Sequence, residues 1–400
     1  MKRILFISPE LPYTGAPLSL LEICKTAKEL GYDVTVWSAE PGPLEIDFQA
    51  EGFAVTIVPT VRANHPDTIA LIKGFDLAVC NTIETDAFAR TCCRYIPTIW
   101  YIHEAANIPN YVNNSSRRLD WLETSRDIVC VSEYAAKEIR KYTKRDTPII
   151  RNCIEDVSDR YLKVAPGSSE KVRFIQLGTI EYIKAFDVLL EAFRLLPPLY
   201  REKSELYLAG RLLPWISEYT KQILREAEEM DSVTYLGELT ATDAMRTIAE
   251  MDVVVVASRG ESCSMVALEG AMLSRPLIVT EDVGASYLVK EDNGIIVKTG
   301  DAESLEKAIE QMIDRADRLK EMGDRSRAYY EEMAGMEYFR EELGKLFQLC
   351  EKKDSFSFKL ERIRNRAVSS TLFCIIRLLK NHGFSYVAER TVKRLTTRER

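Results

Sequence analysis

The sequence predicts an α/β protein with two doubly wound, Rossmann-like domains that face a central cleft, followed by a helical C-terminal tail. Three observations lead to this expectation. The 400 residues exceed what one ordinary hydrophobic core holds. Short β-branched runs alternate with helical patterns, as in parallel βαβ units. The alternation stops once, near 155–170, and then restarts. We therefore expect domains at 1–160 and 168–335, with helices and a basic tail over 336–400.

The first predicted domain opens with RILFIS, a short apolar strand at 3–8. A turn follows, and LSLLEICKTAKELG then places apolar residues at helical spacing, with Gly31 as the stop. The later strand-like runs of this domain are DVTVWS, AVTIV, DLAVCN, TIWYIH and DIVCVS. No G-x-G-x-x-G follows the first strand, which argues against an NAD-linked enzyme.

A polar stretch, EDVSDRYLKVAPGSSEK, indicates a linker between the two domains. The second strand series consists of VRFIQLG, ELYLAG, VTYLG, MDVVVVAS, PLIVT and GIIVK. Ligands of doubly wound sheets bind outside the carboxyl ends of the strands, and in a two-domain protein the natural site is the cleft between the domains.

Composition excludes several classes of protein. Hydrophobic content is 46% and charged content 29%, as in soluble globular proteins. No apolar run approaches the ~20 residues that span a bilayer, and the opening run ILFI is too short for a signal peptide. The nine cysteines form no C-x-x-C pair and mostly stand beside apolar residues, which favours reduced core thiols and a cytoplasmic location.

The formal net charge of −7 conceals an asymmetry. Residues 351–400 contain thirteen Lys or Arg and five Asp or Glu, which gives +8 and leaves −15 on the rest of the chain. The stretch FKLERIRNRAVSSTLFCIIRLLKNHG in this tail is expected to be helical, with its apolar residues clustered around 367–379. One interpretation is a helix packed on the body, and the other is a basic amphipathic helix on an anionic membrane. Nothing in the acidic body supports nucleic-acid binding.

The stretch RGESCSMVALEG, residues 259–270, places two carboxylates after a strand of four valines. A helix is expected to begin near Ser264, and its free N–H groups at 263–266 suit an anion such as a diphosphate. Glu269, about one turn further, can accept two ribose hydroxyls, and Glu261 can bind sugar hydroxyls. A surface that binds a diphosphate between two groups that carry hydroxyls suits a nucleotide-sugar.

Several segments, in order over residues 1–350, resemble the retaining GT-B glycosyltransferases of family 4. The two glutamates form the family's E-x7-E pattern, and GAMLSRPLIVTEDVGAS follows it like the family's EAMACGxPVIxxxxGG. FIQLGTIEYIKAFDVLLEAFRLL is similar to GRLxxxKGxxxLIxAF, and NGIIVKTGDAESLEKAIEQMI to the close of the domain. VSEYAAKEI, IIRNCIED and TGAPLSLLEICKTAKELGYDVTVW match earlier segments. The resemblance implies a nucleotide-sugar-dependent glycosyltransferase.

The resemblance places Lys184 at the donor diphosphate, where a compact cation offsets charge on the leaving phosphate. Thr179 stands where the family has an arginine, and Ala185 replaces the following glycine. Arg211 and Arg259 are candidate substitutes for the missing cation.

In the first domain, Gly15 and Ala16 occupy the position of the family's glycine-rich loop, which approaches the donor phosphates. His103 ends TIWYIH and resembles a histidine near the donor sugar, and Glu104 could orient it or bind acceptor. The expected catalytic residues are His103, Glu261 and Lys184. The expected donor-binding residues are Gly15, Ala16, Gly178, Thr179, Lys184, Glu261, Ser262, Cys263, Ser264, Met265 and Glu269.

For each key residue a structural interpretation stays open. Glu269 can be a solvated helix residue, Lys184 a surface lysine, Cys263 a small loop residue rather than a nucleophile, and His103 a core histidine.

The resemblance implies retaining transfer of a hexosyl group to a glycan or lipid-linked acceptor in cell-surface polysaccharide synthesis, with no cofactor beyond the donor. No D-x-D occurs, so no metal site is expected. The alternatives are a UDP-sugar epimerase on the same fold and a non-catalytic sugar-nucleotide-binding subunit.

Overall fold

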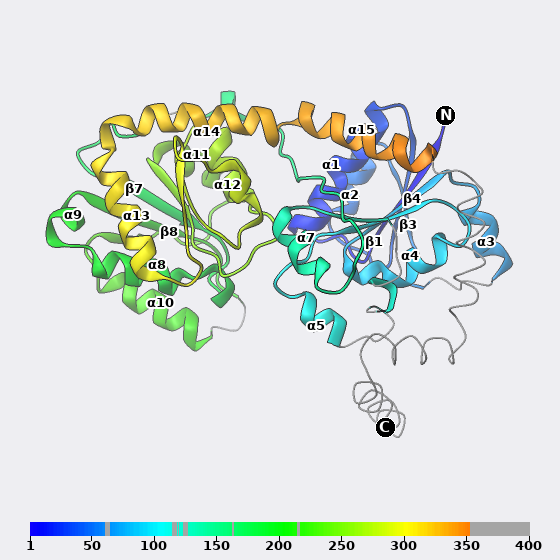
Figure 1. Ribbon diagram of the computed structural model, residues 1–400, viewed down its shortest axis with the longest axis horizontal. Coiled ribbons are helices and arrows are strands. Elements are labelled where there is room, and N and C mark those ends of the chain that lie inside the picture. Colours follow the sequence, from blue (N-terminus) through cyan, green and yellow to red (C-terminus); the bar gives the residue numbers. More distant parts are fainter. Residues whose placement is uncertain are drawn as a thin grey trace, which may run out of the picture.

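The structure is a computed structural model that describes residues 1–60, 65–113, 118, 120–122, 127–161, 164–213 and 217–352. Figure 1 shows two lobes side by side, each built around a parallel sheet with helices on both faces. Each sheet has six strands, so the predicted pair of doubly wound domains is confirmed.

The sheet of the first lobe has the order β3-β2-β1-β4-β5-β6, and every pairing is parallel. Its strands are β1 (Arg3–Ser8), β2 (Asp33–Ser38), β3 (Ala54–Ile57), β4 (Leu77–Asn81), β5 (Thr98–Ile102) and β6 (Ile128–Cys130). Its helices are α1 (Gly15–Glu29), α2 (Glu45–Ala50), α3 (Pro66–Ile72), η1 (Ile83–Thr85), α4 (Asp86–Cys92), α5 (Ile108–Asn113) and α7 (Glu133–Arg140). The predicted strands of this half are all present. The interior strands β4 and β5 are buried along their whole length, and β1 is buried after Arg3, because helices cover both faces of the sheet.

The second lobe repeats the arrangement with the order β12-β11-β10-β7-β8-β9. Its strands are β7 (Val172–Leu177), β8 (Ser204–Ala209), β9 (Val233–Tyr235), β10 (Val253–Val256), β11 (Leu277–Thr280) and β12 (Gly294–Val297). Its helices are η3 (Tyr182–Lys184), α8 (Phe186–Leu195), α9 (Pro198–Glu202), α10 (Glu218–Glu228), α11 (Ala241–Glu250), α12 (Met265–Met272), η4 (Gly284–Leu288), α13 (Ala302–Asp314), η5 (Ala316–Arg318) and α14 (Leu319–Met333). The four valines form β10, which is fully buried.

The segment between the lobes is docked on the second lobe rather than free. It includes η2 (Ser158–Arg160). Its Asp156 carboxylate forms an ion pair with Arg327 of α14, and Tyr330 donates a hydrogen bond of 2.9 Å to the carbonyl of Ile154. The polar composition of this linker therefore reflects ion pairing.

The last described helix, α15 (Met336–Lys352), returns to the first lobe. Figure 1 shows α14 and α15 running along one edge of both lobes. Phe339, Leu343 and Phe347 are buried in the core of the first lobe, and Arg340 pairs with Glu29 of α1. This return was not anticipated from the sequence. Residues 353–400, which hold most of the basic tail and the expected helix with its apolar cluster around 367–379, lie outside the described residues.

Candidate active site

The candidate site of the second lobe lies where the strand order of its sheet reverses. Strands β7 and β10 are paired there, and the loops at their carboxyl ends carry Lys184 and Glu261. Ligands of doubly wound sheets bind at this switch point. The topology therefore brings together two of the residues that the sequence analysis assigned to the donor.

Lys184 and Glu261 form an ion pair. Lys184 Nζ lies 2.8 Å from Glu261 Oε1, and the other carboxylate oxygen accepts a hydrogen bond of 2.9 Å from Ser258 Oγ. The two side chains of the pair are 23% and 21% exposed. A pair that water reaches contributes little to stability. A phosphate group can therefore compete with Glu261 for the lysine at small cost.

The loop that carries Glu261 is held by the segment after β11. The N–H of Glu261 donates to the carbonyl of Asp282 at 3.0 Å, and the N–H of Gly284 donates to the carbonyl of Glu261 at 2.7 Å. A Cβ on Gly284 would lie 1.9 Å from the carbonyl oxygen of Ser262, so only glycine permits this approach. The loop is thus fixed in place before any ligand binds.

Helix α12 begins at Met265 with Ser264 as its N-cap, as predicted. Ser264 Oγ accepts a hydrogen bond of 3.4 Å from the N–H of Ala267. By helix geometry, the N–H groups of Met265 and Val266 have no carbonyl partner within the helix. The helix start therefore offers backbone donors and the positive end of the helix dipole beside the Lys184–Glu261 pair.

Glu269 lies one turn into α12. Its side chain is half-buried and makes no hydrogen bond or ion pair to any described residue. Burial raises the pKa of this carboxyl to about 7. This carboxylate has lost part of its hydration without gaining a partner, which argues against a solvated surface residue. It favours contact with a ligand that carries hydroxyl groups.

Cys263 is a half-buried thiol, not a nucleophile. Burial, with a contribution from the charge of Glu261, raises its pKa to about 12, so the thiol stays protonated. It is hydrogen-bonded to the side chain of Asn152, whose Oδ1 accepts a hydrogen bond of 2.9 Å from Ser19 Oγ of α1. Cys263 thereby links the loop before α12 to the first lobe.

Arg259 does not replace the missing arginine. Its guanidinium donates to Asp187 at 2.9 Å and to the carbonyl of Tyr182 at 2.6 Å, and it stacks 3.9 Å from the Tyr182 ring centroid. These contacts fix the loop after β7. They also pair the positive charge of Arg259 with Asp187. The fork geometry of arginine explains why this residue type stands here.

Arg211 remains as the candidate substitute for the missing arginine. Its carbonyl accepts a hydrogen bond of 3.1 Å from the N–H of Ile180, next to Thr179, and its exposed side chain forms no ion pair with a described residue. The backbones are in close contact, because a Cβ on Gly210 would lie 1.7 Å from the carbonyl oxygen of Gly178. Arg211 is thus anchored beside the position where the family has its arginine.

Ala185 shows why the family has glycine at this position. It adopts φ 54° and ψ 40°, the left-handed conformation, and its side chain is fully buried. An L-residue in this region costs roughly 1–2 kcal/mol. The backbone turn that places Lys184 is therefore retained despite the substitution.

Gly15 and Ala16 belong to the first turn of α1, which corrects their placement in a loop. The helix starts before the expected LSLLEICKTAKELG because the first turn tolerates Pro17, which lacks a backbone N–H, and Thr14 stands before it in an extended conformation. A Cβ on Gly15 would meet nothing within 4 Å, and the carbonyl of Ala16 accepts a hydrogen bond of 3.2 Å from Asn81 Nδ2. Gly15 and Ala16 come after β1, and Asn81 is the last residue of β4, which pairs with β1 at the switch point of the first sheet.

His103 is 8% exposed and follows β5. Its ring packs edge-on against Tyr101 at 4.7 Å, and Nε2 has no hydrogen-bond partner among the described residues. Burial lowers the pKa of this imidazole to about 3, so it is neutral. An orphaned buried nitrogen is unusual in a packed core and is consistent with a ligand contact.

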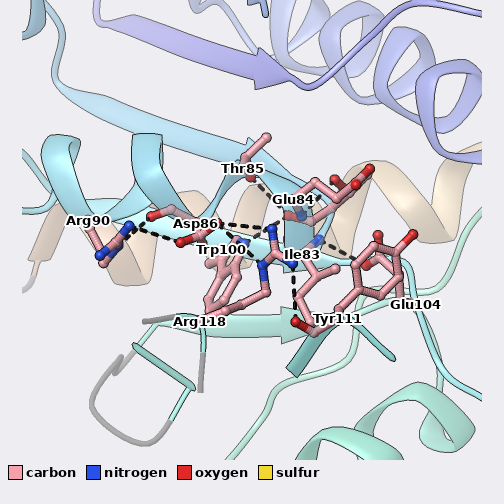
Figure 2. A network of polar contacts seen from close by, with 10 residues as sticks. Ile83, Glu84, Thr85, Asp86, Arg90, Trp100, Glu104, Tyr111 and Arg118 are labelled. Carbon is pink, nitrogen blue, oxygen red and sulfur yellow. Dashed lines mark hydrogen bonds and ion pairs between the residues drawn. The ribbon is translucent and has the colours of Figure 1, made fainter. Parts of the chain in front are cut away.

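Glu104 follows directly and is fixed by backbone donors. Its Oε2 accepts hydrogen bonds of 3.0 Å from the N–H of Ile83 and 3.1 Å from the N–H of His103. Figure 2 shows Glu104 beside Tyr111 at one end of a polar network whose other end is the Asp86–Arg90 ion pair. Burial raises the pKa of Glu104 to about 7.

The two lobes touch next to these residues. A Cβ on Gly260 would lie 2.7 Å from the hydroxyl of Tyr134 and 2.8 Å from the Cβ of Ala106. Lys137 of α7 lies 3.6 Å from Asp282. The loop that carries Glu261 therefore lies against the segment that follows Glu104.

Sequence reasoning missed three residues that shape the site. Ser258 was visible in the sequence as the polar residue after the valine strand, and its hydrogen bond to Glu261 could have been predicted. Asn152 and Thr82 gave no local signal, because their roles depend on contacts with segments far away in the chain.

Comparison with protein-family models gives two consecutive matches. "Glycosyl-transferase family 4" matches residues 1–159, and "Glycosyl transferases group 1" matches residues 171–315. The chain belongs to family 4 of the GT-B glycosyltransferases. The resemblance that rested on short collinear segments is thereby confirmed.

Two curated glycosyltransferases are similar to part of the chain. It is 24% identical over 234 residues to the O-antigen chain mannosyltransferase C of Escherichia coli, a match that covers 57% of this chain and 55% of the relative. It is 21% identical over 206 residues to an uncharacterized glycosyltransferase of Methanocaldococcus jannaschii, covering 51% of this chain and 54% of the relative. The chain thus spans about half the length of the curated relatives it matches.

Solved structures of similar fold include HepE of Anabaena in complex with UDP, with a TM-score of 0.72 and 17% identity over 87% of this chain and 100% of that one. Sucrose-phosphate synthase of Thermosynechococcus elongatus gives a TM-score of 0.69 and 16% identity over 87% and 99%. At these identities the likeness shows the GT-B fold.

Two further properties concern only the described part of the chain. There, no helix combines the length and apolar character needed to cross a bilayer. In the same residues, His, Cys, Asp and Glu side chains do not gather in threes as a metal site would require.

Proposed function

We propose that this family 4 member transfers a hexosyl group from a nucleoside-diphosphate-sugar to a hydroxyl of a glycan or lipid-linked acceptor, with retention of anomeric configuration. The donor binds the second lobe, and the acceptor binds the first. The observation that carries the proposal is the convergence of Lys184, Glu261 and the start of α12 at the β7–β10 switch point. The similar HepE was solved in complex with UDP, which supports a nucleotide as a ligand of this fold.

Each charged group then has a role. The diphosphate takes Lys184 away from Glu261 and accepts hydrogen bonds from the free N–H groups of Met265 and Val266. Glu269 receives the ribose hydroxyls. Glu261, released from the lysine and still oriented by Ser258, binds hydroxyls of the transferred sugar.

The chemistry needs one proton acceptor and one stabilised leaving group. The acceptor hydroxyl attacks C1 on the face from which the diphosphate leaves, and a departing phosphate oxygen takes its proton. The C1–O bond to phosphate breaks as the bond to the acceptor oxygen forms. Lys184 and the helix start stabilise the charge that grows on the leaving diphosphate. The neutral His103 lies on the first-lobe side, where it contacts the donor sugar.

The reaction proceeds without a metal ion in this proposal, since Lys184 and the α12 amides compensate the diphosphate charge. Turnover in excess EDTA tests this point. Activity that disappears with EDTA and returns with Mg²⁺ or Mn²⁺ contradicts it.

We place the enzyme in cell-surface polysaccharide synthesis, at the cytoplasmic side of a membrane. The support is the similarity to the O-antigen chain mannosyltransferase C and the +8 charge of residues 351–400. Deleting 355–400 is expected to lower sedimentation with vesicles that contain anionic lipid but not with neutral vesicles. Equal sedimentation of both proteins contradicts a membrane role for the tail.

The decisive experiment screens UDP- and GDP-sugars for nucleotide release by the full chain without acceptor. We expect slow release from one donor, and proton NMR should detect a first-formed sugar that keeps the donor's anomeric configuration and its configuration at C2. An altered C2 indicates the epimerase alternative. Tight nucleotide binding without any release indicates the non-catalytic subunit. A first product of inverted configuration overturns retention.

A further inference from the structure

The first lobe holds a residue in a backbone conformation that its type avoids. Thr82, directly after β4, has φ 72° and ψ 161°, a region occupied almost only by glycine. Its N–H donates to the carbonyl of Tyr101 at 2.8 Å, and its own carbonyl accepts a hydrogen bond of 2.8 Å from Trp100 Nε1. Two contacts to β5 therefore hold this strained residue in place.

The conformation of Thr82 aims the next N–H group, that of Ile83, at Glu104. This donor and the N–H of His103 both bind Oε2 of the glutamate. Oε1 accepts no hydrogen bond from another described residue, while the N–H of Glu104 itself adds a third backbone contact to the carboxylate, and the side chain is only half-buried, so solvent reaches it. The carboxylate is thus rigidly oriented with one oxygen left for a ligand.

Glu104 also stands near the expected place of reaction. It lies two residues before Ala106, at most about 8 Å along the chain, and Ala106 contacts Gly260, the neighbour of Glu261. On the first lobe, the orphaned Nε2 of His103 lies on the adjacent residue. A group bound to Oε1 is therefore close to the junction of the two lobes.

The charges around this carboxylate are mainly negative. After burial, which is the main cause, Glu84 also raises the pKa of Glu104. The pKa of the Tyr111 hydroxyl is raised by burial and then by Glu84, Glu104 and Glu10, against a lowering by Arg118. The arginines of the network are engaged, since Arg90 and Arg118 lie 3.0 and 3.3 Å from the carboxylate oxygens of Asp86. Figure 2 shows both arginines directed at Asp86, with Glu84 and Glu104 at the other side near Tyr111.

We propose that Oε1 of Glu104 accepts a hydrogen bond from the attacking hydroxyl of the acceptor, and that the acceptor sugar at this position is uncharged or cationic. This inference rests on the proposed function and extends it to the acceptor class. Glu104 orients the hydroxyl, and the proton still leaves with the departing phosphate. An anionic acceptor, such as a uronic acid or a sugar phosphate, is repelled by the carboxylates.

The test uses the full chain with the donor that releases nucleotide, and octyl glycosides of glucose, glucosamine and glucuronic acid as acceptor probes. Wild type is expected to use the first two and not the third. Glu104→Gln keeps a carbonyl oxygen for both backbone N–H groups, so it should fold. It should lower kcat/KM for transfer by about 10- to 100-fold, with hydrolysis of the donor within twofold of wild type. Glu51→Gln, which removes a charge from an exposed side chain of the first lobe that the argument does not use, is the control and should stay within threefold.

Four outcomes overturn the inference: equal transfer by wild type and Glu104→Gln, parallel loss of transfer and donor hydrolysis in that variant, preference for the glucuronide, or donor hydrolysis without transfer to either of the other glycosides. Wild type that hydrolyses no donor is a different result, because it refutes the proposed function and the inference with it.

Discussion

Replacing Glu269 by glutamine should stabilise the ligand-free protein and weaken nucleotide binding. The carboxyl is half-buried on α12 without a described partner, and its pKa rises from 4.5 to about 7. That rise corresponds to at most about 3 kcal/mol against the ionised form. The amide of glutamine also loses hydration, which reduces the expected gain to about 1–2 kcal/mol at pH 8.

The sign of the pH dependence follows from the folded pKa lying above the unfolded one. Below pH 4.5 both states hold the proton and the carboxyl has no effect on the free energy of unfolding. Between pH 4.5 and 7 the unfolded chain ionises first, so wild type loses stability as pH rises. Glu104 behaves in the same way in both proteins, so the difference between wild type and variant isolates Glu269.

The assay compares thermal unfolding of wild type and Glu269→Gln at pH 4 and pH 8, followed by circular dichroism. We expect a Tm gain of about 2–6 °C at pH 8 and none at pH 4. Isothermal titration with the preferred nucleoside diphosphate should show binding weaker by about 10- to 100-fold. Glu332→Gln, an exposed position on α14, is the control and should change neither quantity. A variant that matches wild type in both stability and nucleotide affinity would refute the assignment of Glu269 to a desolvated ribose site.

Three further substitutions test other parts of the site. Lys184→Gln should lower kcat about 100-fold with little loss of stability, because a partly exposed ion pair stabilises weakly while leaving-group stabilisation depends on the charge. Lys221→Gln, which breaks an exposed ion pair on α10, is the control. A wild-type kcat in Lys184→Gln would contradict the role of Lys184. Ala185→Gly should change the free energy of unfolding by less than about 1 kcal/mol, because relief of the left-handed strain offsets the lost methyl and the freer unfolded chain. Ala185→Val should destabilise the protein by more than about 2 kcal/mol. Urea titration measures both, and equal stability of the two variants would be inconsistent with strain. Gly260→Ala should lower kcat and leave nucleotide affinity unchanged, because the added methyl meets Ala106 and separates the lobes, and an unaltered kcat would show that this contact is not needed for turnover.

The sequence was sufficient for the architecture and for choosing the candidate residues of the site. Buried parallel strands are short continuous apolar runs, so their number and order along the chain are visible without a structure. The start of α12 was visible too, because a serine before an apolar run is a local capping signal. Lys184, Glu261 and Glu269 followed from the resemblance of their segments, and their spacing in the chain needed no tertiary information.

Only the tertiary structure decided which of these groups meet. Strand order places β7 beside β10, and this pairing alone brings Lys184 to Glu261. The commitment of Arg259 to Asp187 and the return of α15 to α1 depend on packing between distant segments. The strain at Thr82 is likewise imposed by hydrogen bonds from β5, and no local preference of threonine predicts it. Local signals record what a segment forms by itself, whereas partners and strain arise from the free energy of the whole packed chain.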